Sequence, residues 1–357
     1  MTYRNWPVSQ PAQVSDSERM PLTLRASNIR LGYACINNQL REYDIFTSRG
    51  MILKTFAQKG VEFAKEIIME NIDDLLKILI FNEAHGIRFF RISSCVFPHL
   101  GNPQAAYSYD IGFAKKALKR VGEYAKTHGH RLTSHPGQFC IISTSDEEIF
   151  KRTIVDLQNH VDLFKAMGYT PADGTVLIIH GGGTYGDKAT TLKRWRENFL
   201  KLPVDIQPYI CLENDENNYG IMDLLPVCEE LNIPFCLDIF HNSVSKDRVD
   251  ITKSLMKRIF NTWKRRSMTP KMHVSEQQPG LRRGAHSKTI NRLPLYLFRL
   301  PSMFDTDLDI MLEVKDKEVS VFKIYHRYFN IRMDSTGRVD YVLKKRIVEK
   351  LKLQKKK

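Results

Sequence analysis

Eight short apolar runs, rich in β-branched and aromatic residues, alternate along the chain with longer amphipathic stretches. The runs are 28–36, 87–93, 131–135, 175–180, 209–214, 234–239, 271–275 and 309–314. Between them, stretches such as 110–128, 147–168, 192–202 and 319–329 carry apolar residues at helical spacing. Strands that alternate with helices predict β-α units and a parallel sheet. Eight such units over roughly 300 residues predict an α/β fold closed into a (β/α)8 TIM barrel.

An open, doubly wound sheet is the alternative to the barrel. A dinucleotide-binding sheet of that kind would carry a G-x-G-x-x-G turn after its first strand, and none follows residues 28–36. The chain has 357 residues, of which 42% are hydrophobic, so it can form one large domain with a sizeable core. No apolar run approaches the roughly 18 residues of a membrane span, and we therefore expect no membrane partner.

Charge and cysteine usage indicate the class of partner and the compartment. The chain carries a formal net charge of +14, and a basic surface favours polyanions, of which nucleic acid is the commonest. Six scattered cysteines form no C-x-x-C pair, which predicts reduced thiols and an intracellular protein. A nucleus, an organelle, a bacterial cytoplasm and a virion all remain open. Nothing in the sequence suggests a dimer, so we expect a monomer.

The two ends differ in composition from the rest. Residues 1–27 are polar, contain several prolines and have no apolar block of a signal peptide, which predicts a disordered extension. Residues 336–357 form a basic tail, in which KKRIVEKLKLQKKK carries eight positive charges. The tail is explained equally well as a solvated or targeting segment and as a polyanion-binding element. We expect the barrel domain to span residues 28–335.

Side chains that bind metals gather where the predicted strands end. In chain order they are His99, His135, His180, Glu213, Asp238, His241, His273, His286 and Glu313. The carboxyl ends of all eight strands of a barrel meet at one face, which carries the active site. The sequence therefore predicts that these residues lie close together.

Each of these residues alone also fits a structural role. A buried histidine is more often a hydrogen-bonded core residue than a ligand, and Asp238 and His241 have the spacing of neighbours on a helix face. However, six of the eleven histidines fall at strand ends or in the loops just after them, which favours a metal site. Histidine and carboxylate ligands without a thiolate suit Mn²⁺, our first expectation, or Zn²⁺. The set is too large for one ion, and two or three ions within about 4 Å suit phosphodiester cleavage.

Nine motifs then resemble, in order, those of the UV-damage endonuclease family. They are LGYACINN, FRISSCVFPH, SHPGQF, IIHGGG, LENDE, DIFHN, KMHVSEQ, AHSKT and LEVKDKE, which together cover about residues 28–320. The resemblance implies a (β/α)8 barrel related to endonuclease IV. It also implies a DNA-repair enzyme that nicks damaged double-stranded DNA immediately 5′ of UV photoproducts, and of some other lesions, without a glycosylase step.

The resemblance also implies roles for single residues. The metal ligands would be His135, His180, Glu213, Asp238, His241, His273, His286 and Glu313. Glu213, Lys271 and His273 would be catalytic. Lys271 matches a lysine that can be carboxylated in the family, and a modification that reverses its charge suits a buried position beside cations.

Further matches concern the DNA. Gln138 and Phe139 match the pair that wedges into the duplex at the lesion, although the family often has Tyr at the second position. Phe139 keeps the stacking face of that Tyr without its hydroxyl. Tyr33 and Asn37 match residues that line the pocket for extruded nucleotides, and His99 matches a further histidine near the site.

Four basic side chains, Lys188, Arg282, Arg283 and Lys288, are candidates for salt-dependent phosphate contacts. Extrusion costs least where base pairing is already weakened, so damaged sites would be selected. The alternatives are an abasic-site endonuclease resembling endonuclease IV, a metal-dependent sugar isomerase or epimerase, and a non-catalytic DNA-binding protein. The basic charge and the wedge motif argue against a sugar substrate, and the intact ligand set argues against a non-catalytic protein.

Overall fold

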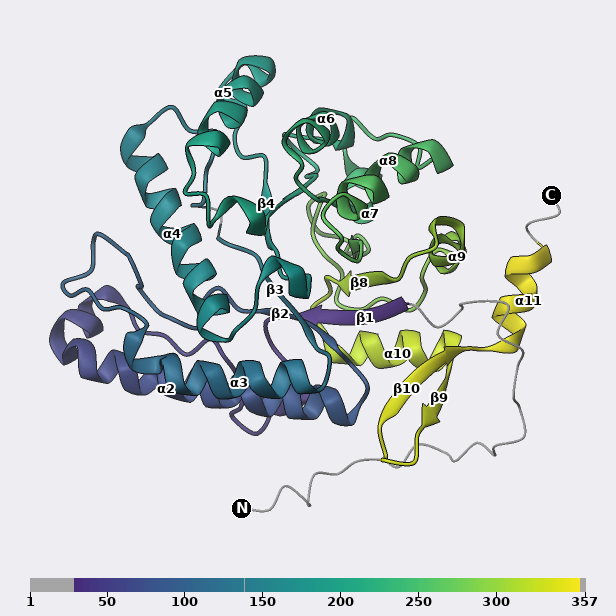
Figure 1. Ribbon diagram of the computed structural model, residues 1–357, viewed down its shortest axis with the longest axis horizontal. Coiled ribbons are helices and arrows are strands. Elements are labelled where there is room, and N and C mark those ends of the chain that lie inside the picture. The colour runs from purple at the N-terminus through teal and green to yellow at the C-terminus, as the bar shows by residue number, and fades with distance from the viewer. Residues whose placement is uncertain (1–28, 138, 354–357) are drawn as a thin grey trace.

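The structure is a computed structural model that describes residues 29–137 and 139–353. The predicted extension 1–27 and Gln138 of the predicted wedge therefore lie outside the described residues. Eight parallel strands pair in chain order into a closed barrel. β1 pairs with β8 to complete it, and these two strands lie side by side in Figure 1. The predicted (β/α)8 barrel is confirmed.

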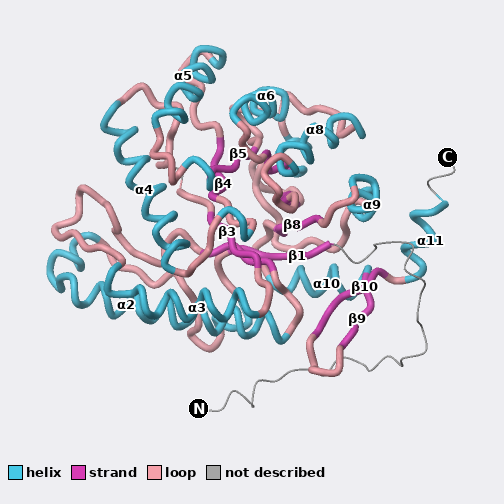
Figure 2. Tube along the Cα trace, in the orientation of Figure 1, coloured by secondary structure: helices cyan, strands magenta, loops and turns pink. Residues whose placement is uncertain are grey.

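The eight barrel strands are short and central, and helices lie around them (Figure 2). The barrel strands are β1 (Ile29–Ala34), β2 (Phe89–Ile92), β3 (Arg131–Ser134), β4 (Leu177–His180), β5 (Ile210–Glu213), β6 (Phe235–Asp238), β7 (Lys271–Val274) and β8 (Leu308–Leu312). Nearly every residue in these strands is buried, as expected of parallel strands that are covered on both faces.

Helices follow the strands along the chain. They are α1 (Asn38–Arg41), α2 (Leu53–Ala84), α3 (Lys115–Thr127), α4 (Glu147–Ala166), α5 (Lys188–Lys201), α6 (Ile221–Leu231), α7 (Ile239–Val244), α8 (Lys253–Lys264), α9 (Leu300–Phe304), α10 (Glu318–Tyr328) and α11 (Lys345–Leu353). Several begin at a side-chain cap: Asp146 accepts from the first backbone N–H groups of α4, and Asp187 does the same for α5. These caps satisfy N–H groups that have no partner inside the helix. No helix within residues 29–137 and 139–353 is long and apolar enough to cross a membrane.

The amino-terminal half of the barrel interior contains a buried charge cluster. Asp309 of β8 is fully buried and accepts two hydrogen bonds from Arg30, at 2.6 and 2.8 Å, and one from Arg131, at 2.6 Å. Because these residues join β8 to β1 and β3, the cluster ties three strands together at the end of the barrel that normally serves stability.

The chain continues past the barrel into a hairpin of β9 (Phe329–Met333) and β10 (Val339–Leu343). The hairpin lies beside α10 (Figure 1), and the ring of Tyr341 stacks on that of Tyr325 with centroids 3.6 Å apart. Arg88 donates to the carbonyl of Val339 at 2.9 Å. The expected boundary at residue 335 falls in the turn of this hairpin, and Ile347 and Val348 of α11 are buried as well, so the first part of the basic segment is folded; residues 354–357 lie outside the described residues. The reason is that Val339 and Leu343 are buried apolar residues, which a charge count of the tail does not register.

Candidate metal centre and active site

The predicted ligands converge at the carboxyl ends of the barrel strands. His180, Glu213 and Asp238 are the last residues of β4, β5 and β6. Register places them beside one another, since His180 pairs with Glu213 and Asp238 pairs with His273 of β7. Parallel strands in register therefore deliver polar side chains from neighbouring strands to one face.

Glu213 is at the centre of the first group and is almost completely buried. Its Oε2 atom lies 3.2 Å from Nε2 of His135 and 3.9 Å from Nε2 of His180. Its Oε1 atom lies 2.5 Å from Nδ1 of His273. Although burial opposes ionisation, His273 and His180 hold the pKa of Glu213 well below its usual range. The group thus keeps a carboxylate among three imidazoles.

A second group shares Glu213. One ligand atom from each of Glu213, Asp238, His273 and Glu313 lies within 4.8 Å of the others. Oδ2 of Asp238 is buried without a hydrogen-bond partner. Burial, followed by the nearby negative charges of Glu213 and Glu313, raises the pKa of Asp238 to about 8. Carboxylates crowded in this way fit a divalent cation, which would supply the missing positive charge.

The remaining imidazoles extend the centre toward β7. The ring centroids of His180 and His241 are 5.9 Å apart, and those of His241 and His286 are 5.5 Å apart. Asp238 is the N-cap of α7 and accepts from the backbone N–H of His241 at 2.7 Å. The Asp-x-x-His spacing therefore serves a short helix and also directs both side chains to the centre.

Lys271 lies beneath this centre and is fully buried. Its Nζ atom is 2.5 Å from Nε2 of His273. Burial lowers the pKa of Lys271, which favours a neutral amine in that place. A neutral amine is the form that reacts with carbon dioxide, so the surroundings are compatible with the predicted carboxylation.

Comparison with known proteins then identifies the family. The model of the UV-endonuclease UvdE family matches residues 29–342. The chain belongs to this family. A putative UV-damage endonuclease of Acanthamoeba polyphaga mimivirus is 64% identical over 318 residues, which is 89% of this chain and 96% of that protein. A UV-damage endonuclease of Schizosaccharomyces pombe is 36% identical over 332 residues, but the match covers only 53% of that longer protein.

A solved structure supports the same assignment. The crystal structure of SacUVDE superposes with a TM-score of 0.72 at 30% identity, covering 83% of this chain and 96% of that chain. The resemblance inferred from the nine motifs is confirmed. The roles of single residues in this UV-endonuclease family member stay predictions, and the structure shows where those among the described residues lie.

The residues expected to meet DNA occupy different surroundings. Phe139 is 81% exposed in the loop that follows β3. Tyr33 and Asn37 are buried, and the hydroxyl of Tyr33 donates to Oδ1 of Asn82 at 2.6 Å. The side chain of Asn37 donates to that hydroxyl and accepts from the N–H of Leu40. Both residues are therefore part of the wall between β1 and α2 in this structure.

His99 and the predicted phosphate contacts lie outside the two groups of ligand atoms. Nε2 of His99 lies 2.7 Å from the carbonyl oxygen of Met51, and its ring stacks on Phe56. Lys188 is paired with Asp223 at 2.9 Å and with Asp247 at 3.4 Å. The other three, Arg282, Arg283 and Lys288, are exposed in the segment after β7.

Two charged residues near the centre were not predicted. Arg91 of β2 forms an ion pair with Glu313. Oε2 of Glu216, in the loop after β5, lies 2.8 Å from Nδ1 of His241. Both residues lie within quoted motifs, FRISSCVFPH and LENDE, but a sequence of charges does not show which partner each one meets.

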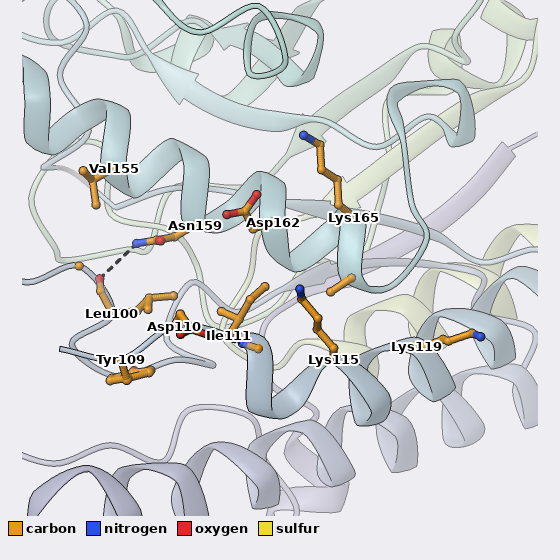
Figure 3. Close-up of a pocket in the computed structure, with 13 residues that line it drawn as sticks. Leu100, Tyr109, Asp110, Ile111, Lys115, Lys119, Val155, Asn159, Asp162 and Lys165 are labelled. Atoms are coloured by element: carbon orange, nitrogen blue, oxygen red, sulfur yellow. Dashed lines mark hydrogen bonds between the residues drawn. The ribbon is translucent and has the colours of Figure 1, made fainter.

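A groove of ≈ 890 Å³ lies elsewhere on the barrel, between the loop after β2 and helices α3 and α4 (Figure 3). Lys115 of α3 and Lys165 of α4 line it, and the side chain of Asn159 donates to the carbonyl of Leu100 across one end. None of the predicted site residues lines this groove. The groove is thus separate from the candidate metal centre.

Proposed function

We propose that this chain is a metal-dependent DNA-repair endonuclease that nicks the backbone immediately 5′ of UV photoproducts. The observation that carries the proposal is the centre around Glu213, where the ends of five strands bring imidazole nitrogens to 2.5–3.9 Å from the carboxylate oxygens of Glu213 and Glu313. Membership of the UV-endonuclease family supports DNA damage as the substrate class.

The chemistry of the ligand set supports divalent metal ions. His135, His180 and Glu213 would hold one ion, and Glu213, Asp238, His273 and Glu313 would hold another. Such ions activate water and stabilise the leaving oxygen in phosphodiester hydrolysis. Mn²⁺ is our first expectation and Zn²⁺ the second, since both accept imidazole and carboxylate ligands.

The protein residues would divide the remaining work. Glu213 and His273 form the hydrogen-bonded pair at the heart of the site, and Lys271 in its carboxylated form would add a further ligand. Phe139, exposed on the same face, would occupy the gap left by the damaged bases. Arg282 and Arg283 would hold phosphates and make the affinity depend on salt.

The test is nicking of supercoiled plasmid in Mn²⁺, with UV-irradiated, depurinated and undamaged DNA compared. We expect nicking mainly of irradiated DNA, and we expect a chelator to stop it. Nicking of depurinated DNA alone would move the chain to the abasic-site class. No nicking of any plasmid by protein that contains bound metal would refute the proposal.

A variant links the activity to the centre. Glu213→Gln should abolish nicking and reduce metal content measured by mass spectrometry, while binding of damaged duplex remains measurable. Glu62→Gln is the matched control, because that side chain is 81% exposed on α2. Full nicking by Glu213→Gln would exclude the role assigned to Glu213.

A further inference from the structure

Exposed aromatic side chains are concentrated at one part of the barrel. Among the described residues they are Tyr43, Tyr107, Phe139 and Tyr185. Each lies in the loop that follows one of the strands β1 to β4, and these loops leave the carboxyl ends of neighbouring strands. The four residues therefore belong to loops that start on the face of the candidate metal centre.

The backbone just before Tyr185 is held by hydrogen bonds from side chains of neighbouring elements. Tyr185 lies five residues after His180 and has a φ of 47°, a left-handed conformation that is unfavourable for an aromatic residue. The carbonyl of Gly183 accepts from the hydroxyl of Tyr219 at 3.2 Å, and that of Thr184 accepts from the hydroxyl of Thr191 at 2.7 Å. Tyr185 is nevertheless 54% exposed, so this loop presents an aromatic side chain to solvent.

A cation lies against this ring. The guanidinium carbon of Arg194 on α5 is 5.3 Å from the ring centroid of Tyr185. Arg194 also donates to the carbonyl of Ser143 at 2.8 Å and to the hydroxyl of Thr191 at 3.4 Å. Because these partners are neutral, they leave the positive charge available to attract a polyanion.

The same helix supports the loop of Phe139. The side chain of Asn198 on α5 donates to the carbonyls of Ile142 and Thr144 at 2.8 and 2.9 Å. The loops also touch directly, since a Cβ on Gly182 would lie 2.5 Å from Oγ of Ser143. Phe139 and Tyr185 thus lie in two loops that pack against each other and against α5.

We propose that Tyr185 is a second base-stacking residue, which contacts an unstacked nucleobase of the damaged duplex while Phe139 inserts at the lesion. The inference rests on the proposed function and adds a substrate-binding residue to it. Extruding damaged bases leaves neighbouring or opposite bases without stacking partners. An exposed aromatic ring backed by an arginine fits such a base, because stacking needs only a π face and the charge attracts the phosphate backbone.

The test compares binding of a duplex that contains one UV photodimer, by fluorescence anisotropy, in a Glu213→Gln background that prevents nicking. Tyr185→Ala should weaken binding roughly 10-fold, in line with the loss of one base–aromatic stack. Tyr185→Phe should stay within about 2-fold, because the hydroxyl takes no part in stacking. Leu200→Ala is the control and should change nothing, since Leu200 is an exposed apolar side chain at the far end of α5.

A kinetic measurement separates binding from structural damage. In the otherwise unchanged enzyme, Tyr185→Ala should raise KM for damaged DNA with kcat and thermal stability preserved. Unchanged affinity in Tyr185→Ala, while Phe139→Ala binds weakly, would overturn the inference and leave the proposed function intact. Equal losses in Tyr185→Ala and Tyr185→Phe would also overturn it, since the hydroxyl and not the ring would be the contact. A wild-type protein that neither prefers nor nicks damaged DNA would refute the proposed function itself.

Discussion

The charge cluster at the amino end of the barrel allows a quantitative test of what holds the fold together. The perturbation is Asp309→Asn, which keeps the shape of the side chain but removes its charge. Asp309 is fully buried and accepts three hydrogen bonds of 2.6–2.8 Å from Arg30 and Arg131. The variant would leave Arg131, whose side chain is only 2% exposed, without an anionic partner.

The expected loss follows from the burial of that charge. Breaking a buried ion pair by removing one partner costs about 3–5 kcal/mol. Asn can still accept a hydrogen bond, and Arg131 keeps its bonds to the carbonyls of Gly174 and Thr269. We therefore expect the lower value, a fall of about 3 kcal/mol in the free energy of unfolding. At about 2 °C per kcal/mol in a chain of this size, Tm should fall by about 6 °C.

The assay is urea unfolding at pH 7 and at pH 3, with Asp307→Asn as the control because Asp307 is exposed two residues earlier. Although burial opposes ionisation, Arg30 and Arg131 lower the pKa of Asp309. A depressed carboxyl pKa stabilises the folded state above the unfolded pKa of about 4, and that stabilisation is lost as the pH falls below it. The gap between wild type and variant should therefore be full at pH 7 and smaller at pH 3.

The outcome that refutes the reasoning is a difference below about 1 kcal/mol at pH 7. It would mean that the attraction of Asp309 for the two arginines does no more than offset the free-energy cost of burying its charge. Nicking per folded molecule provides a further check, since the cluster lies at the opposite end of the strands from the candidate metal centre. A specific loss of activity without a loss of stability would contradict this separation.

Three further predictions concern the metal and the packing. Glu216→Gln should weaken Mn²⁺ binding, measured by titration, about 10- to 100-fold, because the carboxylate of Glu216 would no longer hold the imidazole of His241 in place. Unchanged affinity for Mn²⁺ would exclude a role of Glu216 in orienting His241. Gly122→Ala should cost about 3 kcal/mol in urea unfolding, since its Cβ would lie 1.8 Å from the carbonyl oxygen of Met167, whereas Gly50→Ala should be neutral. Removing metal with a chelator should lower Tm in a way that added Mn²⁺ reverses, because ions that bind only the folded state stabilise it; an unchanged Tm would count against a filled site.

The barrel and the convergence of its polar strand ends were predictable because both depend on short, contiguous sequence patterns. A strand that ends in His180 or Glu213 shows an apolar run closed by a polar residue, and parallel topology then sets both ends on one face. Register, which brings His180 beside Glu213, follows once the order of strands is known. The pattern thus carries both the fold and the position of the site.

Contacts across the fold were not predictable in the same way. The buried hydroxyl of Tyr33 finds its hydrogen-bond acceptor in Asn82, which is 49 residues away on α2. The pairing of Arg91 with Glu313 joins residues 222 positions apart. The hairpin after α10 was hidden by the charges around it, although Val339 and Leu343 anchor it. A linear pattern specifies which residue types are available but not which distant partner each one meets.

The two ends of the barrel interior differ in charge balance, and this difference separates stability from function. At the amino end, the carboxylate of Asp309 faces the two guanidinium groups of Arg30 and Arg131. At the carboxyl end, the acidic groups of Glu213, Asp238 and Glu313 lie close together, and Arg91 forms an ion pair with Glu313. Two arginines offset the charge of Asp309 at the first end, whereas we expect the crowded carboxylates of the second end to be stabilised by divalent cations. Substitutions at Asp309 should therefore act on unfolding, and substitutions at Glu213 should act on metal binding and nicking.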